Sequence, residues 1–203
     1  MYESNQNEGW HIMDKRRFLI AGASATAASL LTVGCTTTGS GSSDPGVRRQ
    51  SIESGVDRAL SDLYRQVGGS EDLVRSARGT LVFPSVVAAG FIVGGATGEG
   101  ALREAGKTTG FYRTTTAMAG FLAGAQSTAV FYLFMTPDAL SRFKASNGWQ
   151  VGADAGVTLA TVGANARVDT RSAQQPIVGF VLSNAGLMAN LSLDGSRVTR
   201  LDI

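Results

Sequence analysis

The chain has 203 residues, of which 43% are hydrophobic and 26 are glycine, and a formal net charge of +2. This length fits one modest domain with a leader, and the small charge gives no indication of a nucleic-acid partner. Cys35 is the only cysteine, which excludes an intrachain disulfide.

The N-terminal 35 residues have the pattern of an export signal. Whether Met1 or Met13 is the true start stays open: Met13 is followed by three basic residues and the apolar run 18–33, which favours residues 1–12 as a mis-called start. A basic start, a short apolar run and the sequence Val-Gly-Cys predict a lipoprotein signal over 13–35, with Cys35 lipidated. An uncleaved anchor helix is the alternative, and the export route, general or twin-arginine, stays open.

Residues 36–46 are mostly threonine, glycine and serine, a composition that cannot bury apolar area. Such a segment predicts a flexible tether between the lipidated cysteine and the domain over 47–203. No aspartate follows Cys35, so the signal that retains bacterial lipoproteins in the inner membrane is lacking. The resemblance to lipoproteins therefore favours the periplasmic face of the outer membrane.

Two helices are expected next. The first helix is expected from Val47 to Val67, with Arg58 and Arg65 on its polar face. Its opposite, apolar face consists of residues at spacings of three and four: Ile52, Val56, Leu60, Leu63 and Val67. Ser70 is expected to cap a second helix that ends near Gly79. The arginine face either is simply solvated or contacts anionic head groups.

Short apolar runs punctuated by glycine and proline then predict strands. We expect a strand at Leu81–Phe83, a break at Pro84 that leaves this residue at a strand end or bulge, a second strand at 86–93, and a tight turn at Gly98-Glu99-Gly100. Further strands are expected near 110–116, 128–135, 151–168 and 177–182, with a last hairpin of 187–193 and 198–203 across Asp194-Gly195.

A short helix from 139 to 144, capped by Thr136 with Pro137 at its first position, is expected between these strands. The predicted fold class is therefore α+β. Its core is an antiparallel, strand-rich barrel or sandwich of about seven or eight strands, flanked by two N-terminal helices and one short central helix.

The stretch VFPSVVAAGFIVGGATGEGAL, residues 82–102, resembles the signature of the SYLF domain family of lipid-binding modules. The resemblance continues through Gly110-Phe111-Tyr112-Arg113, residues 120–126, residues 130–135 and Gly186-Leu187-Met188, and so covers about 47–203. It implies a non-enzymatic phospholipid-binding domain. Eukaryotic members bind actin, so a protein partner also has precedent in the family.

The residues themselves offer little for catalysis. The only histidine is His11, in the leader, which excludes histidine-dependent catalysis and histidine metal sites from the domain. Gly106-Lys107-Thr108 lacks the upstream glycine of a phosphate-binding loop, so Lys107 is expected at a hairpin tip. Glu99 and Asp154 lie beside glycines in apolar surroundings and are interpreted as turn carboxylates. We expect no enzymatic activity, metal or cofactor.

The expected function is binding of an anionic phospholipid or phosphoinositide by a membrane-tethered envelope lipoprotein. Arginine suits this role because its planar fork binds phosphate in a bidentate way. The alternative is a structural or protein-interaction lipoprotein, and the oligomeric state stays open. The candidate lipid-binding residues are Arg58, Arg65, Arg75, Arg78 and Lys107.

Overall fold

Three helices and nine strands make up the part of the chain that the computed structural model describes: residues 44–90, 93–119, 126–160, 168, 174–183, 186–187 and 193–203. These residues all belong to one compact unit, Ser40–Ile203. The predicted leader, Cys35 and most of the predicted tether lie outside the described residues.

The sequence explains where the first helix, α1 (Pro45–Gln66), begins. The Asp44 carboxylate accepts a hydrogen bond from the Gly46 amide at 2.7 Å, and Pro45 occupies the first turn, where its missing N–H costs nothing. Residues 45 and 46 are therefore helical, which corrects the prediction that the flexible segment extends to 46. The apolar stripe is buried as expected, with Val56 and Leu63 fully enclosed.

The second helix, α2 (Ser70–Ser76), begins differently from the prediction. Gly69, with a positive φ, is the N-cap and makes no side-chain hydrogen bond. Ser70 is instead the first helical residue and is buried; its hydroxyl donates back to the Val67 carbonyl at 2.6 Å. The serine thus joins the end of α1 to the start of α2.

The strand β1 (Gly79–Gly90) runs through Pro84 without ending there, so the prediction of two separate strands is wrong. Its pairing shifts register between Val82 and Ser85 on one side and between Phe83 and Val86 on the other. Pro84 therefore lies in a bulge, as its missing N–H requires.

The next strand, β2 (Val93–Glu104), contains the Gly-Glu-Gly sequence in its middle, so the predicted turn there is also wrong. A Cβ on Gly100 would lie 2.0 Å from the Val82 carbonyl oxygen, which shows that glycine serves close strand packing at this point. The turn lies at Ala105 and Gly106, both with positive φ, and Lys107 begins β3 (Lys107–Ala119) directly after it, as expected.

The remaining elements largely follow the predicted order. Thr136 caps α3 and Pro137 begins it, as predicted. The elements are β4 (Gln126–Phe134), α3 (Pro137–Ala145), β5 (Trp149–Gln150), β6 (Thr158–Leu159), β7 (Ile177–Ser183), β8 (Gly186–Leu187) and β9 (Arg197–Leu201).

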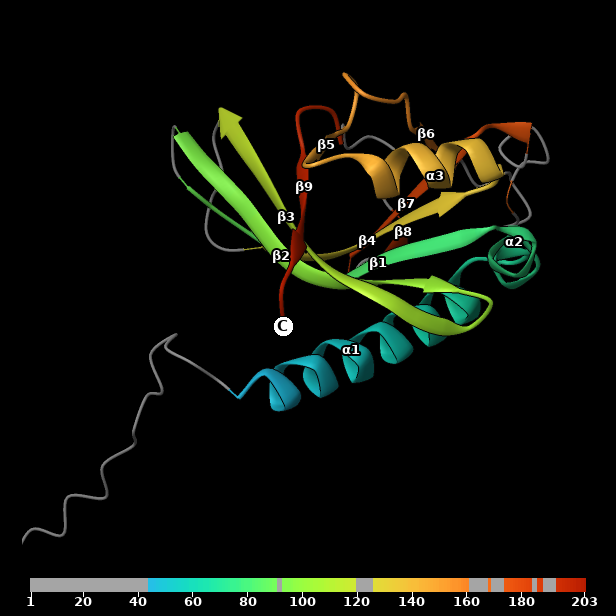
Figure 1. Cartoon of the computed structure of the whole chain (residues 1–203), viewed down its shortest axis with the longest axis horizontal. Coiled ribbons are helices and arrows are strands. Elements are labelled where there is room, and N and C mark those ends of the chain that lie inside the picture. Colours follow the sequence, from blue (N-terminus) through green and yellow to red (C-terminus); the bar gives the residue numbers. More distant parts are fainter. Residues whose placement is uncertain are drawn as a thin grey trace, which may run out of the picture. The chain divides into compact units, whose positions relative to one another are not determined.

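One curled sheet holds all nine strands, in the order β5-β9-β3-β2-β1-β4-β7-β6, with β8 paired to β7. All pairs are antiparallel except β6 with β7, and the sheet forms a half-barrel (Figure 1). The α+β prediction is confirmed. The predicted final hairpin is wrong, because β9 pairs with β3 and β5, and Leu187 pairs with Leu182 of β7.

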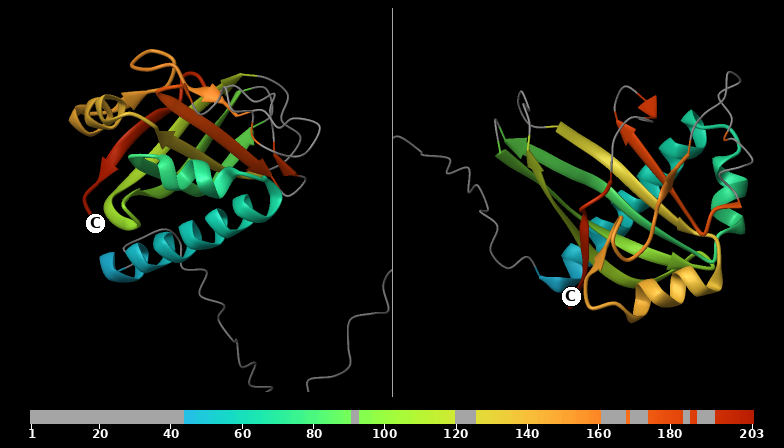
Figure 2. Two further views of the ribbon diagram at one scale, coloured as in Figure 1. Left: turned by 90° about the vertical axis from the view of Figure 1, so that its right-hand side faces the viewer. Right: turned by 90° about the horizontal axis from the view of Figure 1, so that it is seen from above.

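Alternating side chains of the central strands fill two cores. Leu81, Phe83 and Tyr132 face the side covered by α3, whereas Val82 and Phe131 face the side covered by α1 and α2. Figure 1 and Figure 2 show α1 and α3 on opposite faces of the sheet. Both cores consist of residues after 51, so a chain that begins at Ser40 retains every buried contact among the described residues.

Candidate functional site

A groove of about 640 Å³ runs between α1 and the outer face of β1, β4 and β7. We call it the α1 groove. Arg58 and Arg65 line it from the helix, and its apolar lining includes Ile52, Pro84 and Leu182. Five hydroxyl side chains also line it: Ser51, Ser85, Ser127, Thr128 and Ser183. The remaining polar lining is the amide of Gln66 and the carboxylates of Asp62 and Glu99, which are paired with Arg65 and with Arg48 and Arg113.

The two arginines of the α1 groove differ in their partners. Arg65 forms an ion pair with Asp62, three residues earlier on the helix. Arg58 is exposed and has no hydrogen bond or ion pair with any residue that the structure describes. An unpaired guanidinium beside several hydroxyls is a favourable place for a phosphate group, because it offers donors in a fixed fork.

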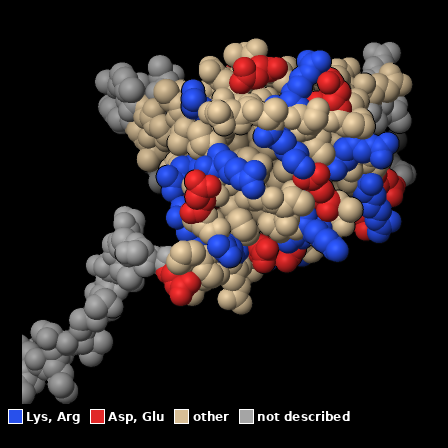
Figure 3. Space-filling view, in the orientation of Figure 1, with Lys and Arg blue, Asp and Glu red and all other residues tan. Residues whose placement is uncertain are grey.

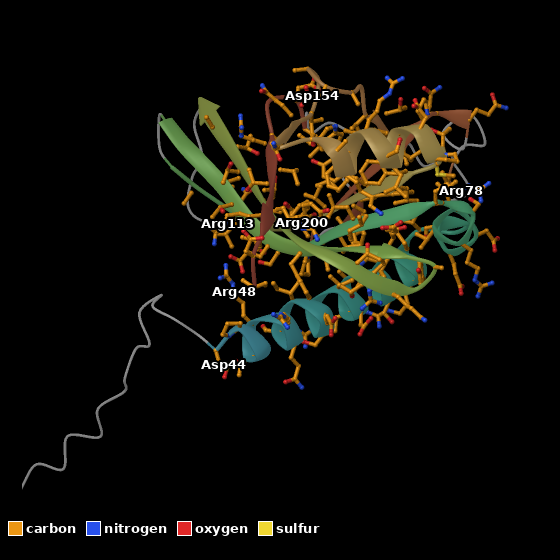
Figure 4. All side chains as sticks on the ribbon, in the orientation of Figure 1. Asp44, Arg48, Arg78, Arg113, Asp154 and Arg200 are labelled. Atoms are coloured by element: carbon orange, nitrogen blue, oxygen red, sulfur yellow. The ribbon has the colours of Figure 1, made fainter. Side chains whose placement is uncertain are left out.

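The structure does not bring the other three predicted residues to this groove. Arg75 is paired with Glu71 on α2, at 2.5 Å. Arg78 lies beside α3, where it lines a separate apolar hollow with Leu140 (Figure 4). Lys107 lies at the β2–β3 turn, exposed. The predicted set is therefore divided into four places, of which only the α1 groove holds two members.

A charged cluster that sequence reasoning missed lies at the start of α1. Arg48 donates from Nε to Glu99 Oε2 at 2.9 Å, and Arg113 of β3 donates to Glu99 Oε1 at 2.7 Å. Figure 4 shows Arg48 and Arg113 on the same side of the molecule. The hydrogen bond from Arg48 is the main cause that holds the pKa of Glu99 below its ordinary value.

Strand register was the signal that could have revealed this cluster. Glu99 and Arg113 are directly opposite each other on β2 and β3, once the turn is placed at Ala105 and Gly106. The interpretation of Glu99 as a turn carboxylate is wrong for the same reason. Asp154, in contrast, does lie in a turn, where its carboxylate accepts the Gln150 amide at 2.6 Å.

A second ion pair ties α1 to β2. Arg103 Nη1 lies 2.6 Å from Asp57 Oδ1, and the side chain of Arg103 is only 20% exposed. Together with the pair of Arg48 and Glu99, it fixes the helix at two points along the sheet. The position of the α1 groove is thereby determined by charge as well as by apolar packing.

Within the described ranges, no group of three or more His, Cys, Asp or Glu side chains is placed to hold a metal ion. Among the helices of the same ranges, none combines the length and the apolar character needed to cross a bilayer.

Comparison with known proteins gives one match. The Ysc84 family, described as "Las17-binding protein actin regulator", matches residues 115–202. No curated protein matches the chain. The domain of this family, the SYLF domain, is linked to lipid binding, and the family is generally non-catalytic. The match over residues 115–202, from the middle of β3 to the end of β9, confirms the resemblance of this chain to SYLF domains.

Proposed function

We propose that this protein is a non-catalytic phospholipid-binding module that takes an anionic head group, of a glycerophospholipid or a phosphoinositide, into the α1 groove. The observation that carries the proposal is Arg58, an unpaired guanidinium at the edge of a groove that also contains Arg65 and five hydroxyl side chains. The two carboxylates of the groove, Asp62 and Glu99, are each engaged by other arginines, which leaves Arg58 available to a phosphate. The link of the SYLF domain to lipid binding supports it.

The chemistry of the groove suits the two parts of a lipid head group. A phosphate monoester or diester accepts charge-assisted hydrogen bonds from Arg58, while Ser85 and Ser127 offer neutral hydrogen bonds to a polyol. The ion pair of Arg65 with Asp62 is exposed and therefore weak, so Arg65 can turn to a phosphate at little cost.

Binding of this kind is sensitive to salt. Each arginine near an anionic membrane contributes about 1 kcal/mol, and the contribution is screened within a Debye length. Two arginines at one groove therefore give an affinity that falls measurably when salt is raised. Arg75, Arg78 and Lys107 lie elsewhere and are not part of the proposed site.

The experiment is co-sedimentation of residues 40–203 with vesicles of phosphatidylcholine, with and without phosphatidylglycerol. The double variant Arg58→Ala/Arg65→Ala should bind anionic vesicles about thirtyfold more weakly, from about 1 kcal/mol per arginine. Its matched control is Arg142→Ala/Lys144→Ala, which removes the same charge from α3. Equal binding by both double variants would refute the α1 groove as the site.

We further propose that the protein is held at a membrane by lipidation of Cys35, at the periplasmic face of the outer membrane. The support is the sequence alone: the basic start, the apolar run and Val-Gly-Cys. Replacing Cys35 by Ser and fractionating cells tests the tether. Unchanged membrane recovery of the Cys35→Ser chain would contradict it.

The alternative function is binding of a protein partner, which the description of the family, "Las17-binding protein actin regulator", favours. The vesicle experiment separates the two functions. Failure of the intact domain to sediment with anionic vesicles at low salt would leave the protein-binding role as the better proposal.

A further inference from the structure

One end of the sheet contains no charged side chain. The sequence has no Asp, Glu, Lys or Arg between Arg78 and Glu99, or between Arg113 and Asp138. The register of the four central strands brings the outer halves of these two stretches together. This "uncharged end" comprises residues 86–90 of β1, 93–98 of β2, 114–119 of β3 and 126–128 of β4.

The outer face of the uncharged end is bare. Ser127, Val87, Thr97 and Thr115 follow one another as direct neighbours across β4, β1, β2 and β3, and all four are exposed. Val87 is 43% exposed, although it is one of the large apolar residues. Figure 1 and Figure 2 show that β2 and β3 project here beyond α1 and α3.

Positive charge borders this face. Arg197 of β9 is the direct neighbour of Thr115 and continues the same row. Two residues further along β2 and on the same face as Thr97 is Glu99, which lies opposite Arg113. Arg48 of α1 and Arg113 share the single carboxylate of Glu99, so the three side chains together keep a net positive charge. In Figure 3, blue side chains border the tan surface at the upper left.

The uncharged end is also continuous with the α1 groove. Ser127 belongs to both, and Ser85, which lines the groove, lies two residues from Val87 on the same face of β1. A lipid whose phosphate is held at Arg58 can therefore direct its glycerol and upper acyl carbons past Ser85 and Ser127 onto this face, since the carboxylate of Glu99 in the groove is neutralised by Arg48 and Arg113.

We propose that the uncharged end enters the head-group layer of an anionic bilayer, with Arg197 and the Arg48–Arg113 pair at the level of the phosphates. The inference rests on the proposed function and adds the depth and orientation of binding. Burial of this face desolvates only small, hydroxyl and apolar side chains, whereas the bordering guanidiniums gain phosphate partners. An acidic partner protein would be complementary to the bordering arginines but would not bury the apolar side chain of Val87.

Fluorescent labels test the orientation directly. Residues 40–203 contain no cysteine, so single cysteines can be placed at Val87, Thr97 and, as the matched control, Thr158. Thr158 is exposed on β6, at the edge of the sheet beyond β7. With vesicles of phosphatidylglycerol and phosphatidylcholine, an environment-sensitive label at 87 or 97 should shift to the blue and be quenched by nitroxide-bearing lipids, and a label at 158 should not.

A charge substitution provides a second test of the same orientation. Val87→Glu should weaken vesicle binding at least tenfold, also at a salt concentration that removes most of the effect of Arg58, because a carboxylate loses its hydration when it enters the head-group layer. Thr158→Glu, with the same charge change, should leave binding unaltered. Circular dichroism of both variants shows whether the fold is retained.

The outcomes separate the two proposals. Sedimentation with vesicles but no shift at 87 or 97 overturns the inference and leaves the proposed function intact. Equal shifts at 87, 97 and 158 also overturn it, because they indicate adsorption without orientation. Absence of sedimentation overturns both.

Discussion

Gly55 of α1 and Pro84 of β1 are in such close contact that a Cβ on Gly55 would lie 2.9 Å from Pro84 Cγ. The helix therefore lies in direct contact with the sheet where β1 bulges. Both residues line the α1 groove, so this contact sets how wide the groove is at that point. The helix α1 can lie this close to the sheet because Gly55 has no Cβ atom.

Substitution of Gly55 by valine should therefore destabilise the protein. A branched side chain cannot fit against Pro84 without moving the helix, and such overpacking costs about 2 kcal/mol. Urea unfolding of residues 40–203 measures the effect. Ser61→Val, at an exposed position of the same helix, should change stability by no more than about 0.5 kcal/mol. Equal effects at the two positions would show that helix propensity, and not the contact, is responsible.

Gly100 should tolerate no side chain at all. The Cβ of Gly100→Ala would lie 2.0 Å from the Val82 carbonyl oxygen, which is backbone and cannot move aside cheaply. We expect a loss of about 3 kcal/mol, at the upper end for overpacking. Gly156→Ala is the control, since its Cβ would meet no atom within 4 Å. A thermal melt that leaves Gly100→Ala as stable as Gly156→Ala would contradict the close strand packing.

The Glu99 cluster should stabilise the protein in a pH-dependent way. The pKa of Glu99 is lowered from its ordinary value of 4.5, mainly by the hydrogen bond from Arg48. Because the folded-state pKa lies below the unfolded one, the stabilisation is complete above about pH 4.5 and is lost as the pH falls through the folded-state pKa.

Glu99→Gln should accordingly cost about 1 kcal/mol at neutral pH, a modest value because the cluster is partly exposed. The difference from the wild type should shrink between neutral pH and a pH below the folded-state pKa of Glu99, where the wild-type carboxyl becomes protonated. Urea unfolding at the two pH values measures it. A difference that does not depend on pH would mean that Glu99 acts through packing alone.

An aromatic cluster joins α3 to the sheet, and Phe143 lies at its centre. The ring centroid of Phe143 is 4.8 Å from that of Phe134, 5.0 Å from that of Tyr112 and 5.4 Å from that of Trp149. Phe143→Ala should cost about 4 kcal/mol through the lost burial and the cavity, and Phe143→Leu clearly less. Near-ultraviolet circular dichroism should lose the signal of Trp149 in the first variant and keep most of it in the second.

The sequence was informative wherever one local rule acted alone. The apolar period of α1, the cap and proline of α3 and the uncharged runs of β3 and β4 predicted these elements, since capping and periodic burial are local effects. Of the two positions predicted for Pro84, a strand end or a bulge, the structure shows the bulge, because a missing N–H cannot take part in regular pairing in any sheet.

The errors arose where tertiary contacts determine the use of a residue. Gly98 and Gly100 fit a turn by composition, yet they are needed where β2 crosses the bulge of β1. Asp194-Gly195 does turn the chain, but β9 pairs with β3, far away in sequence. The pair of Arg48 and Glu99 likewise joins residues 51 positions apart, which no local pattern predicts.

The position of β9 between β3 and β5 has a consequence for how the chain folds. The strands β1, β2 and β3 form successive hairpins and can assemble early, but the edge of β3 at residues 111–115 gains its partner only when residues 197–201 arrive. Until then the nascent sheet presents an open edge of threonines and aromatic residues, which is a template for pairing with another chain. The pairing of β9 with β3 should therefore be the slow step of folding, because it brings together segments that are far apart in the sequence. The risk of aggregation should be greatest before this pairing occurs.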